Sequence, residues 1–370
     1  MTLEVREIND EAGMSDFLAL PAAIYRNDKN WVAPQLSEVK RALNPSLNPY
    51  FVNASLQLFV CYLGGKPVCR SILVINRLHW QRWDKKSAFF GFFESYDDAE
   101  AVKYLFTRIE QEARKSGAET IEGPFNPNHY SELGILTDNF NTEPLFFETY
   151  NPSYYPLLLK EAGLTISEIL HTRTNSDIAA TLSKLKRIIK EPDLEYKGYT
   201  IRKFNIFRMK RDLEILREIN NEAFENNHHF LPLSHEEYRF SAQFLFFVTL
   251  PKLIWIVEHN GKPAGAIQCV INFNRLIKPF NGKMNWWHIP GLLIRRKNSK
   301  ELIIFTVGVK KTYRKSPVLA MIVRSALKIF QSYSTLSTTW VSDENKGVNH
   351  FSDLLQMKPY KHFALYSKQL

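Results

Sequence analysis

The sequence predicts an α/β protein built from two consecutive domains, each with a mixed β-sheet flanked by helices. Two observations carry this prediction. The chain has 370 residues, and domains of about 100–200 residues are usual. Apolar runs and turns recur at a fixed spacing, and strands and helices follow one another in the same order in both halves. The hydrophobic fraction of 45% and the charged fraction of 23% exclude a disordered or fibrous chain.

The clearest repeat is a pair of glycine turns. Gly65-Lys66-Pro67 recurs as Gly261-Lys262-Pro263, 196 residues later. Apolar runs flank each copy, so each copy is expected to be a β-hairpin around a glycine turn. The same offset places a strand candidate at residues 3–6 on another at residues 199–202. Two matches at one offset indicate a tandem duplication.

The duplication divides the chain into an N-terminal domain, residues 1–190, and a C-terminal domain, residues 191–370. The segment Lys190-Glu191-Pro192-Asp193 has the composition of a connector.

In the first half, the strand at residues 3–6 precedes a helical region, the first hairpin and a strand at residues 89–93. The pattern Ser95-Tyr96-Asp97-Asp98 is typical of a capping box and predicts the start of a helix. Gly117 fits the end of that helix. Five apolar residues predict its buried face: Val102, Leu105, Phe106, Ile109 and Ala113.

In the second half, a strand at residues 302–307 follows the hairpin. Pro317 suits the first turn of the next helix. Five apolar residues predict the buried stripe of that helix: Val318, Met321, Ile322, Ile329 and Phe330.

Both halves end in the same way, with a strand, a short helix and a last strand. The short strands are expected at residues 120–122 and 338–341, and the short helices at residues 155–162 and 351–357.

This order of elements resembles the GNAT acyltransferase fold. In the second half, residues 307–315 (Val-Gly-Val-Lys-Lys-Thr-Tyr-Arg-Lys) look like the end of the GNAT central strand and its coenzyme loop. Glu344-Asn345 followed by Leu354-Leu355 resembles a later helix of that fold. The first half looks like a group of uncharacterised bacterial tandem GNAT-like proteins. Four segments carry this likeness: residues 28–34, 89–94, 123–126 and 150–155. The resemblance implies two tandem GNAT-like domains.

The resemblance also implies a site for acyl-CoA, the expected cosubstrate. GNAT enzymes bind its pyrophosphate with backbone amides at a helix N-terminus, where the helix dipole favours anions. The residues expected to bind it are Val309, Lys310, Lys311, Arg314, Lys315, Ser316 and Asn345. The loop departs from the family pattern, because Pro317 stands at the first glycine position and Leu319 at the second. In the first half, Glu94, Asp97 and Asp98 would repel a phosphate, so the usual binding of CoA is not expected there.

Two residues of the first half are candidates for catalysis. Glu94 ends an apolar strand and suits a general base toward an amine, with its pKa raised by burial. Tyr155 begins the short final helix and offers a hydroxyl to a cleft. The alternatives are a carboxylate that faces solvent or caps a helix, and a tyrosine that packs structurally. In the second half, Ser352 stands where many GNAT enzymes have the tyrosine that protonates the leaving thiolate.

Metal and disulfide chemistry are not expected. Cys61, Cys69 and Cys269 lack CxxC spacing, and three thiols of this kind indicate a reducing, cytoplasmic setting. His228-His229 and His235 have no carboxylate or cysteine at a recognisable metal-ligand spacing.

Charge is uneven along the chain. The net charge is +10, but residues 1–190 hold 21 basic and 23 acidic residues, whereas residues 191–370 hold 27 basic and 15 acidic ones. Two basic clusters, residues 295–300 and 310–315, suit phosphates of a nucleotide, a coenzyme or RNA, or else form a solvated surface.

Trp286-Trp287 lies between the hairpin and the next strand. Three roles are compatible with this position: lining a substrate pocket, stacking on a base, or packing as a lid. No apolar stretch is long enough to span a membrane.

Three functions are compatible with the sequence. The first is an N-acyltransferase that moves an acyl group from acyl-CoA, or a related thioester, to a small-molecule amine. The second is a catalytically degenerate GNAT-like module that binds a metabolite or a protein. The third is an aminoacyl-tRNA-dependent transferase, with RNA held by the basic C-terminal half.

Overall fold

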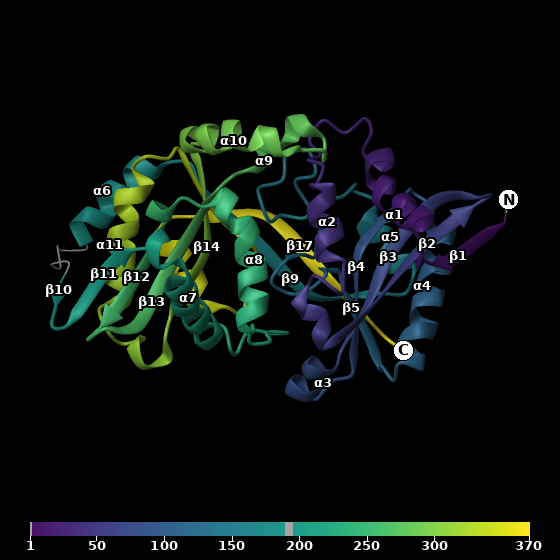
Figure 1. Cartoon of the computed structure of the whole chain (residues 1–370), viewed down its shortest axis with the longest axis horizontal. Coiled ribbons are helices and arrows are strands. Elements are labelled where there is room, and N and C mark those ends of the chain that lie inside the picture. Colours follow the sequence, from purple (N-terminus) through teal and green to yellow (C-terminus); the bar gives the residue numbers. More distant parts are fainter. Residues whose placement is uncertain (1, 189–194) are drawn as a thin grey trace. The chain divides into compact units, whose positions relative to one another are not determined.

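The computed structural model describes residues 2–188 and 195–370, and these form two compact units. Unit 1 comprises Met1–His171, Ile277–Met284 and Lys361–Leu370, and unit 2 comprises Thr172–Leu276 and Asn285–Tyr360 (Figure 1). The connector predicted at residues 190–193 lies outside the described residues.

Most elements belong wholly to one unit. The strands of unit 1 are β1 (Leu3–Glu7), β2 (Ala54–Leu63), β3 (Lys66–Asn76), β4 (Ser87–Ser95), β5 (Thr120–Gly123), β6 (Phe125–Asn126), β7 (Glu132–Leu133) and β8 (Ile135–Leu136). Its helices are α1 (Glu11–Ile24), α2 (Leu36–Ala42), α3 (Arg77–Trp83), α4 (Ala99–Lys115) and α5 (Tyr155–Glu161). The strands of unit 2 are β10 (Glu195–Tyr196), β11 (Tyr199–Lys203), β12 (Ile254–His259), β13 (Lys262–Ile271), β14 (Glu301–Val309), β15 (Thr335–Thr338) and β16 (Val341–Ser342). Its helices are α6 (Ile178–Ile188), α7 (Met209–Ala223), α8 (His235–Val248), α10 (Ile289–Arg295), α11 (Val318–Phe330) and α12 (Lys346–Leu354). Three elements contain residues of both units: α9 (Asn274–Ile277), β9 (Thr165–Asn175) and β17 (Lys358–Gln369).

The two sheets have the same plan. In unit 1, β1 to β4 are antiparallel neighbours, and β4 pairs with β5 in parallel. In unit 2, β11 to β14 are antiparallel neighbours, and β14 pairs with β15 in parallel. The predicted mixed α/β fold is therefore confirmed.

The offset of 196 residues holds down to the register of the strands. Leu3 pairs with Leu63 in unit 1, and Tyr199 pairs with His259 in unit 2. Both hairpins also have a β-bulge at the same place, between Cys61 and Tyr62 and between Val257 and Glu258. A shared register and a shared bulge are difficult to reach independently, because each depends on many side-chain contacts. The structure thus supports the duplication.

The last strands are distributed in a way that the sequence pattern did not show. The C-terminal part of β17 belongs to unit 1, where Tyr366 pairs with Gly123 of β5. The end of β9 belongs to unit 2, where Asn175 pairs with Leu336 of β15. Each compact unit therefore contains a strand segment from the other half of the sequence. The division at residue 190 describes the repeat, whereas the compact units divide the chain elsewhere.

Several predicted boundaries differ from the structure. Helix α4 starts at Ala99, and its N-cap is Asp98, whose Oδ1 accepts the Ala101 N–H at 2.9 Å, so Ser95 remains in the strand. Strand β15 ends at Thr338, where the prediction began, and α12 starts at Lys346 rather than at residue 351. Short polar side chains compete for capping, and tertiary packing selects among them.

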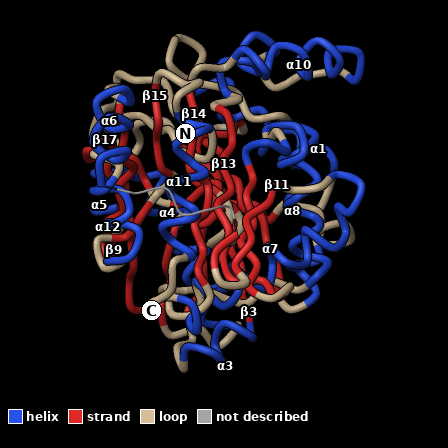
Figure 2. The backbone as a smooth tube through the Cα atoms, turned by 90° about the vertical axis from the view of Figure 1, so that its left-hand side faces the viewer, coloured by secondary structure: helices blue, strands red, loops and turns tan. Residues whose placement is uncertain are grey.

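Helices cover both faces of each sheet. In unit 1, α4 and α5 pack on one face through the predicted stripe of α4, and α1 contacts β3. In unit 2, a Cβ on Gly265 would meet Val318 of α11, whereas one on Gly308 would meet Ile219 of α7, so these helices lie on opposite faces. Figure 2 shows helices on both sides of the strands of unit 2.

A buried ion pair anchors the C-terminal segment in unit 1. Lys361 of β17 is 0% exposed, and its Nζ lies 3.0 Å from Oε2 of Glu148 and 2.9 Å from the carbonyl oxygen of Glu143. Because a buried ammonium group loses its hydration, these oxygens replace the water that Lys361 would otherwise bind.

Replacing the buried lysine is expected to destabilise unit 1. Lys361→Met removes the ammonium group that lies 3.0 Å from the buried Glu148 carboxylate, and we expect a loss of about 3–5 kcal/mol, measured by denaturant unfolding. Adding Glu148→Gln removes the buried negative charge and should recover part of the loss. Equal stability of Lys361→Met and the wild type would show that the pair does not hold the C-terminal segment.

Candidate functional site

The candidate site of unit 1 lies at the end of β4, where the strand is distorted. The pairing of β3 with β4 shifts register after Arg70↔Glu94, and Phe92 has a positive φ of 46°. A Cβ on Gly91 would lie 1.7 Å from the carbonyl oxygen of Phe125, so only glycine permits this close approach of the next segment. Asn126 then accepts the Phe92 N–H through Oδ1 at 2.6 Å. The bulge redirects the residues that follow, among them Glu94.

Glu94 is the centre of a polar cluster within unit 1. Its Oε2 accepts hydrogen bonds from Tyr155 Oη at 2.7 Å and from Tyr25 Oη at 2.9 Å. Arg70 Nη2 lies 3.9 Å from the other carboxylate oxygen, Oε1. The Glu94 side chain is 16% exposed. The two catalytic candidates named from the sequence, Glu94 and Tyr155, are therefore in direct contact, and whether they act in catalysis stays a prediction.

The electrostatics of the cluster follow from its burial. Desolvation raises the pKa of Glu94, although Arg70 and the two phenols act in the opposite direction by favouring its charged form. Desolvation and the Glu94 charge hold the pKa values of Tyr25 and Tyr155 well above their usual range. Both phenols therefore remain protonated donors near neutral pH.

Arg70 is buried beside the carboxylate, and its burial lowers its pKa. Its Nη1 donates to the carbonyl oxygen of Phe17, and its guanidinium lies 4.4 Å from the centre of the Phe17 ring. Because a guanidinium group is strongly basic, Arg70 places a positive charge next to Glu94 despite its burial.

Neighbouring residues hold the cluster in place. Tyr155 Oη also accepts the Ser95 N–H at 2.8 Å, and Tyr154 Oη donates to the Ser95 carbonyl oxygen at 2.9 Å. Tyr25 stacks on Trp31 with ring centres 5.0 Å apart. Three of the segments that resemble bacterial tandem GNAT-like proteins, residues 28–34, 89–94 and 150–155, thus contribute to one site.

One oxygen of Glu94 accepts no hydrogen bond among the described residues, although Arg70 lies 3.9 Å from it. Among the described residues, both tyrosines bind Oε2, and no hydrogen-bond donor lies within bonding distance of Oε1. A carboxylate oxygen with a free lone pair can accept the N–H of an amine, which is the geometry required of a general base.

Sequence analysis missed Arg70, Tyr25 and Glu132. Arg70 left a signal, since it is a lone charge in the apolar strand Val68-Cys69-Arg70-Ser71-Ile72. Glu132 of β7 is solvent-exposed, yet desolvation by the surrounding protein and the charge of Glu94 raise its pKa to about 7. It is a second carboxyl group of unit 1, beside Glu94, whose pKa is raised.

The described part of unit 2 has no counterpart of the cluster. The offset of 196 residues places Ala266 on Arg70, and Ala266 pairs with Gly308 as Arg70 pairs with Glu94. The space at Gly308 is taken by α7, because an added Cβ would lie 2.9 Å from Ile219. Unit 1 and unit 2 therefore share a backbone plan but differ at the position of the candidate base.

Two of the lysines expected to bind coenzyme are paired with acids. Val309 ends β14, and Lys310 follows it with its Nζ 3.4 Å from Glu218. Lys311 pairs with Glu225, and its N–H donates to Glu222 at 2.7 Å. Carboxylates thus pair with the two ammonium groups and accept the Lys311 N–H, which are the groups that a phosphate would bind.

The rest of the expected coenzyme loop is more open. Arg314 and Lys315 are exposed and have no ion-pair partner among the described residues. Ser316 binds the Tyr313 carbonyl oxygen through Oγ at 2.6 Å, and Asn345 caps α12 by accepting the Val348 N–H at 3.2 Å. The binding of coenzyme by this loop stays a prediction, and the contacts favour Arg314 and Lys315 as its charged part.

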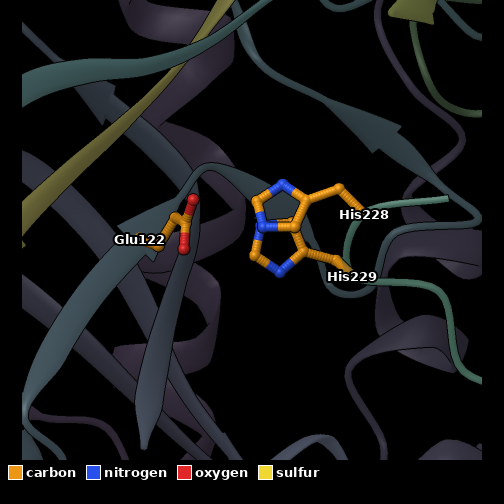
Figure 3. Close-up of side chains that lie close together, drawn as sticks. All are labelled: Glu122, His228 and His229. Carbon is orange, nitrogen blue, oxygen red and sulfur yellow. The ribbon is translucent and has the colours of Figure 1, made fainter. Parts of the chain in front are cut away.

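Figure 3 labels Glu122, His228 and His229. Within unit 1, Glu122 of β5 is buried, lies 3.1 Å from Lys85 Nζ and accepts a hydrogen bond from Ser167 Oγ at 3.1 Å. Within unit 2, the rings of His228 and His229 lie 3.7 Å apart, centre to centre, in the segment before α8. The expectation that the protein uses no metal stays a prediction.

Removing the buried arginine is expected to destabilise unit 1 in a pH-dependent way. Glu94 has a raised pKa in the folded state, so the native state keeps its proton longer than the unfolded chain and stability falls as pH rises above the ordinary value of 4.5. Arg70→Met removes a charge that lowers this pKa, and we expect a loss of about 3–5 kcal/mol at neutral pH and a smaller one at pH 5, measured by denaturant unfolding. Arg70→Met/Glu94→Gln should be less pH-dependent. A pH-independent loss in the single variant would contradict the assignment.

Two curated proteins are similar to the chain over almost its full length. A protein named bacterial ceramide synthase, from Caulobacter vibrioides, is 28% identical over 379 residues, which cover 100% of this chain and 98% of that protein. Protein YghO of Escherichia coli is 28% identical over 378 residues, which cover 99% of this chain and 95% of that protein. No family model matches the chain.

A solved structure shows the fold. A tandem GNAT protein from the clavulanic acid biosynthesis pathway matches with a TM-score of 0.55 and 13% identity, covering 100% of this chain and 98% of that one. The similarity of this structure to the chain and the repeated plan of the sheets agree with the resemblance to the GNAT fold seen in the sequence. The chain has the GNAT acyltransferase fold in two tandem copies.

Proposed function

We propose that the protein is an N-acyltransferase that moves an acyl group from a thioester to the amine of a long-chain amino alcohol. The observation that carries this proposal is Oε1 of Glu94 at the distorted end of β4, which accepts no hydrogen bond among the described residues. The GNAT fold and the full-length similarity to a protein named bacterial ceramide synthase support it, since a ceramide is the amide of such an amine.

The proposed reaction needs one proton acceptor and one donor. The amine nitrogen attacks the thioester carbon, a C–N bond forms, the C–S bond breaks, and a proton passes from nitrogen to Glu94 Oε1. The thiolate leaves and is protonated in turn. Tyr155 is 1% exposed and donates to Glu94, so we assign it the role of a positioning residue that fixes the carboxylate.

The acyl donor is the less defined substrate. In unit 1, Asp98 caps α4 and occupies the Ala101 amide, so the residues there do not fit a pyrophosphate. In unit 2, the exposed Arg314 and Lys315, which precede α11, fit one better, although the N-cap of α11 is Pro317, which has no N–H. We therefore propose an acyl thioester as donor, with acyl-CoA as the form to test first.

A catalytically degenerate binding module is the second candidate. The pairing of Lys310 and Lys311 with glutamates and the aspartate cap of α4 favour it, because both reduce the attraction of a phosphorylated donor. No described contact favours the tRNA-dependent alternative.

Loss of the Glu94 carboxylate is expected to abolish most of the activity. We expect Glu94→Gln to lower kcat/KM for amide formation from a long-chain acyl-CoA and sphinganine by about 10²–10³-fold, measured by mass spectrometry of the product. The acid limb of the pH profile should disappear with it, since deprotonation of the carboxyl produces that limb.

Three further variants control this experiment. Glu119→Gln removes an exposed surface carboxylate that pairs with Lys86 and should retain full activity. Tyr155→Phe removes a hydrogen bond that lowers the Glu94 pKa. The acid limb of the pH profile of this variant should therefore move to higher pH. If Glu132→Gln removes the acid limb and Glu94→Gln does not, the base is Glu132 and the assignment to Glu94 is wrong.

Binding of coenzyme is expected to raise the thermal stability of the protein. A ligand that prefers the native state raises Tm, so we expect a shift with CoA and with a long-chain acyl-CoA that Arg314→Ala/Lys315→Ala loses. Lys66→Ala/Lys262→Ala, which changes two exposed hairpin lysines, should keep the shift. No shift with either ligand would contradict a CoA donor and favour the binding module.

A further inference from the structure

One helical segment of unit 2 is apolar on the side that faces solvent. It consists of the short 3₁₀ helix Trp286–His288, helix α10 and the 3₁₀ helix Arg296–Asn298 in succession. Figure 1 shows α10 beyond the strands of its unit rather than on a face of the sheet.

The inner face of the segment is apolar and at least half-buried, as is usual for a helix on the surface of a protein. Leu292 is buried at 4% exposure, and Ile289, Leu293 and Arg296 are half-buried around it. Their spacing of three and four residues defines one helix face. Arg296 donates to the Thr249 carbonyl oxygen at 3.4 Å, which attaches this face to unit 2.

The outer face is equally apolar. Trp286, Trp287 and Ile294 are 77%, 57% and 67% exposed, and Pro290 is exposed between them. The expectation of a packed tryptophan lid is therefore not met. A helix that is apolar on all sides is normally buried, so this exposed face requires a partner that accepts apolar groups.

Basic residues continue directly from the apolar face. Arg295, Lys297 and Lys300 are exposed, and residues 259–300 contain no aspartate or glutamate. The partner must therefore combine an apolar region with negative charge. A lipid bilayer with anionic headgroups has both, at the depths where tryptophan rings and lysine side chains are most stable.

We propose that residues 286–300 bind the surface of an anionic membrane, with the outer face of α10 inserted among the headgroups. Trp286, Trp287 and Ile294 would supply the apolar contact, and Arg295, Lys297 and Lys300 the attraction to phosphates. Aliphatic Ile294 and Pro290 favour a bilayer over RNA, because base stacking requires flat side chains. Among the described residues no helix is long and apolar enough to cross a membrane, so the proposed contact is with the surface.

The inference does not depend on the proposed acyl transfer. It adds to it, because a long-chain amine resides in membranes and a surface-bound enzyme would meet it there. Each proposal can be refuted without the other, because vesicle binding is measured without any substrate.

Flotation with lipid vesicles tests the proposal. We expect the full-length protein to float with vesicles containing about one third phosphatidylglycerol and to bind about tenfold more weakly to pure phosphatidylcholine. Trp286→Ser/Trp287→Ser should weaken binding to anionic vesicles by about tenfold, because it removes the apolar insertion. Arg295→Gln/Lys297→Gln/Lys300→Gln should also weaken it and should reduce its sensitivity to salt.

Phe207→Ser is the matched control. Phe207 is 92% exposed in unit 2 but lies outside the segment, so its loss should leave vesicle binding unchanged. Circular dichroism of each variant verifies its folding. The proposal is overturned if the wild type does not float with anionic vesicles, if the tryptophan variant floats as well as the wild type, or if Phe207→Ser weakens binding equally. Retardation of RNA without vesicle binding would assign the basic residues to a nucleic acid instead.

Discussion

A carboxylate in the interior of unit 1 sets the main constraint on this protein. Glu94 loses most of its hydration at the end of β4, and a buried charge is tolerated only when other groups replace the lost water. Arg70 comes from β3, Tyr25 from the end of α1 and Tyr155 from the first residue of α5. One side chain thus fixes how four elements meet, and among the described residues the same contacts leave Oε1 without a hydrogen bond.

Comparison of the two units shows how a duplicated fold diverges in chemistry. The backbone register is shared residue by residue at the hairpins, because register depends on many side chains and one residue of slip would turn the core outward. Single positions are less constrained. Arg70 and Glu94 in unit 1 correspond to Ala266 and Gly308 in unit 2, and the space this frees is filled by α7. The excess of basic residues lies in the second half.

The two proposals concern different units and different physics. Acyl transfer in unit 1 depends on a few fixed hydrogen bonds, in which a small displacement changes the pKa of the base. Membrane binding by unit 2 depends on exposed apolar area and on net charge, which tolerate variation in geometry. A lipid amine as substrate connects them, because such a molecule presents a polar amine to the base and an apolar chain to the membrane.

The sequence by itself determined the α/β class, the duplication, the hairpins and the candidates Glu94 and Tyr155, because hydrophobic periodicity and glycine turns are local signals. It did not place Arg70 and Tyr25 beside Glu94, and it located the start of α4 within residues 95–98 without selecting Asp98 as the cap. It also gave no sign that β17 and the end of β9 belong to units formed mainly by the other half. Strand partners and buried charge pairs depend on contacts between residues more than a hundred positions apart, and these are fixed only when the chain packs.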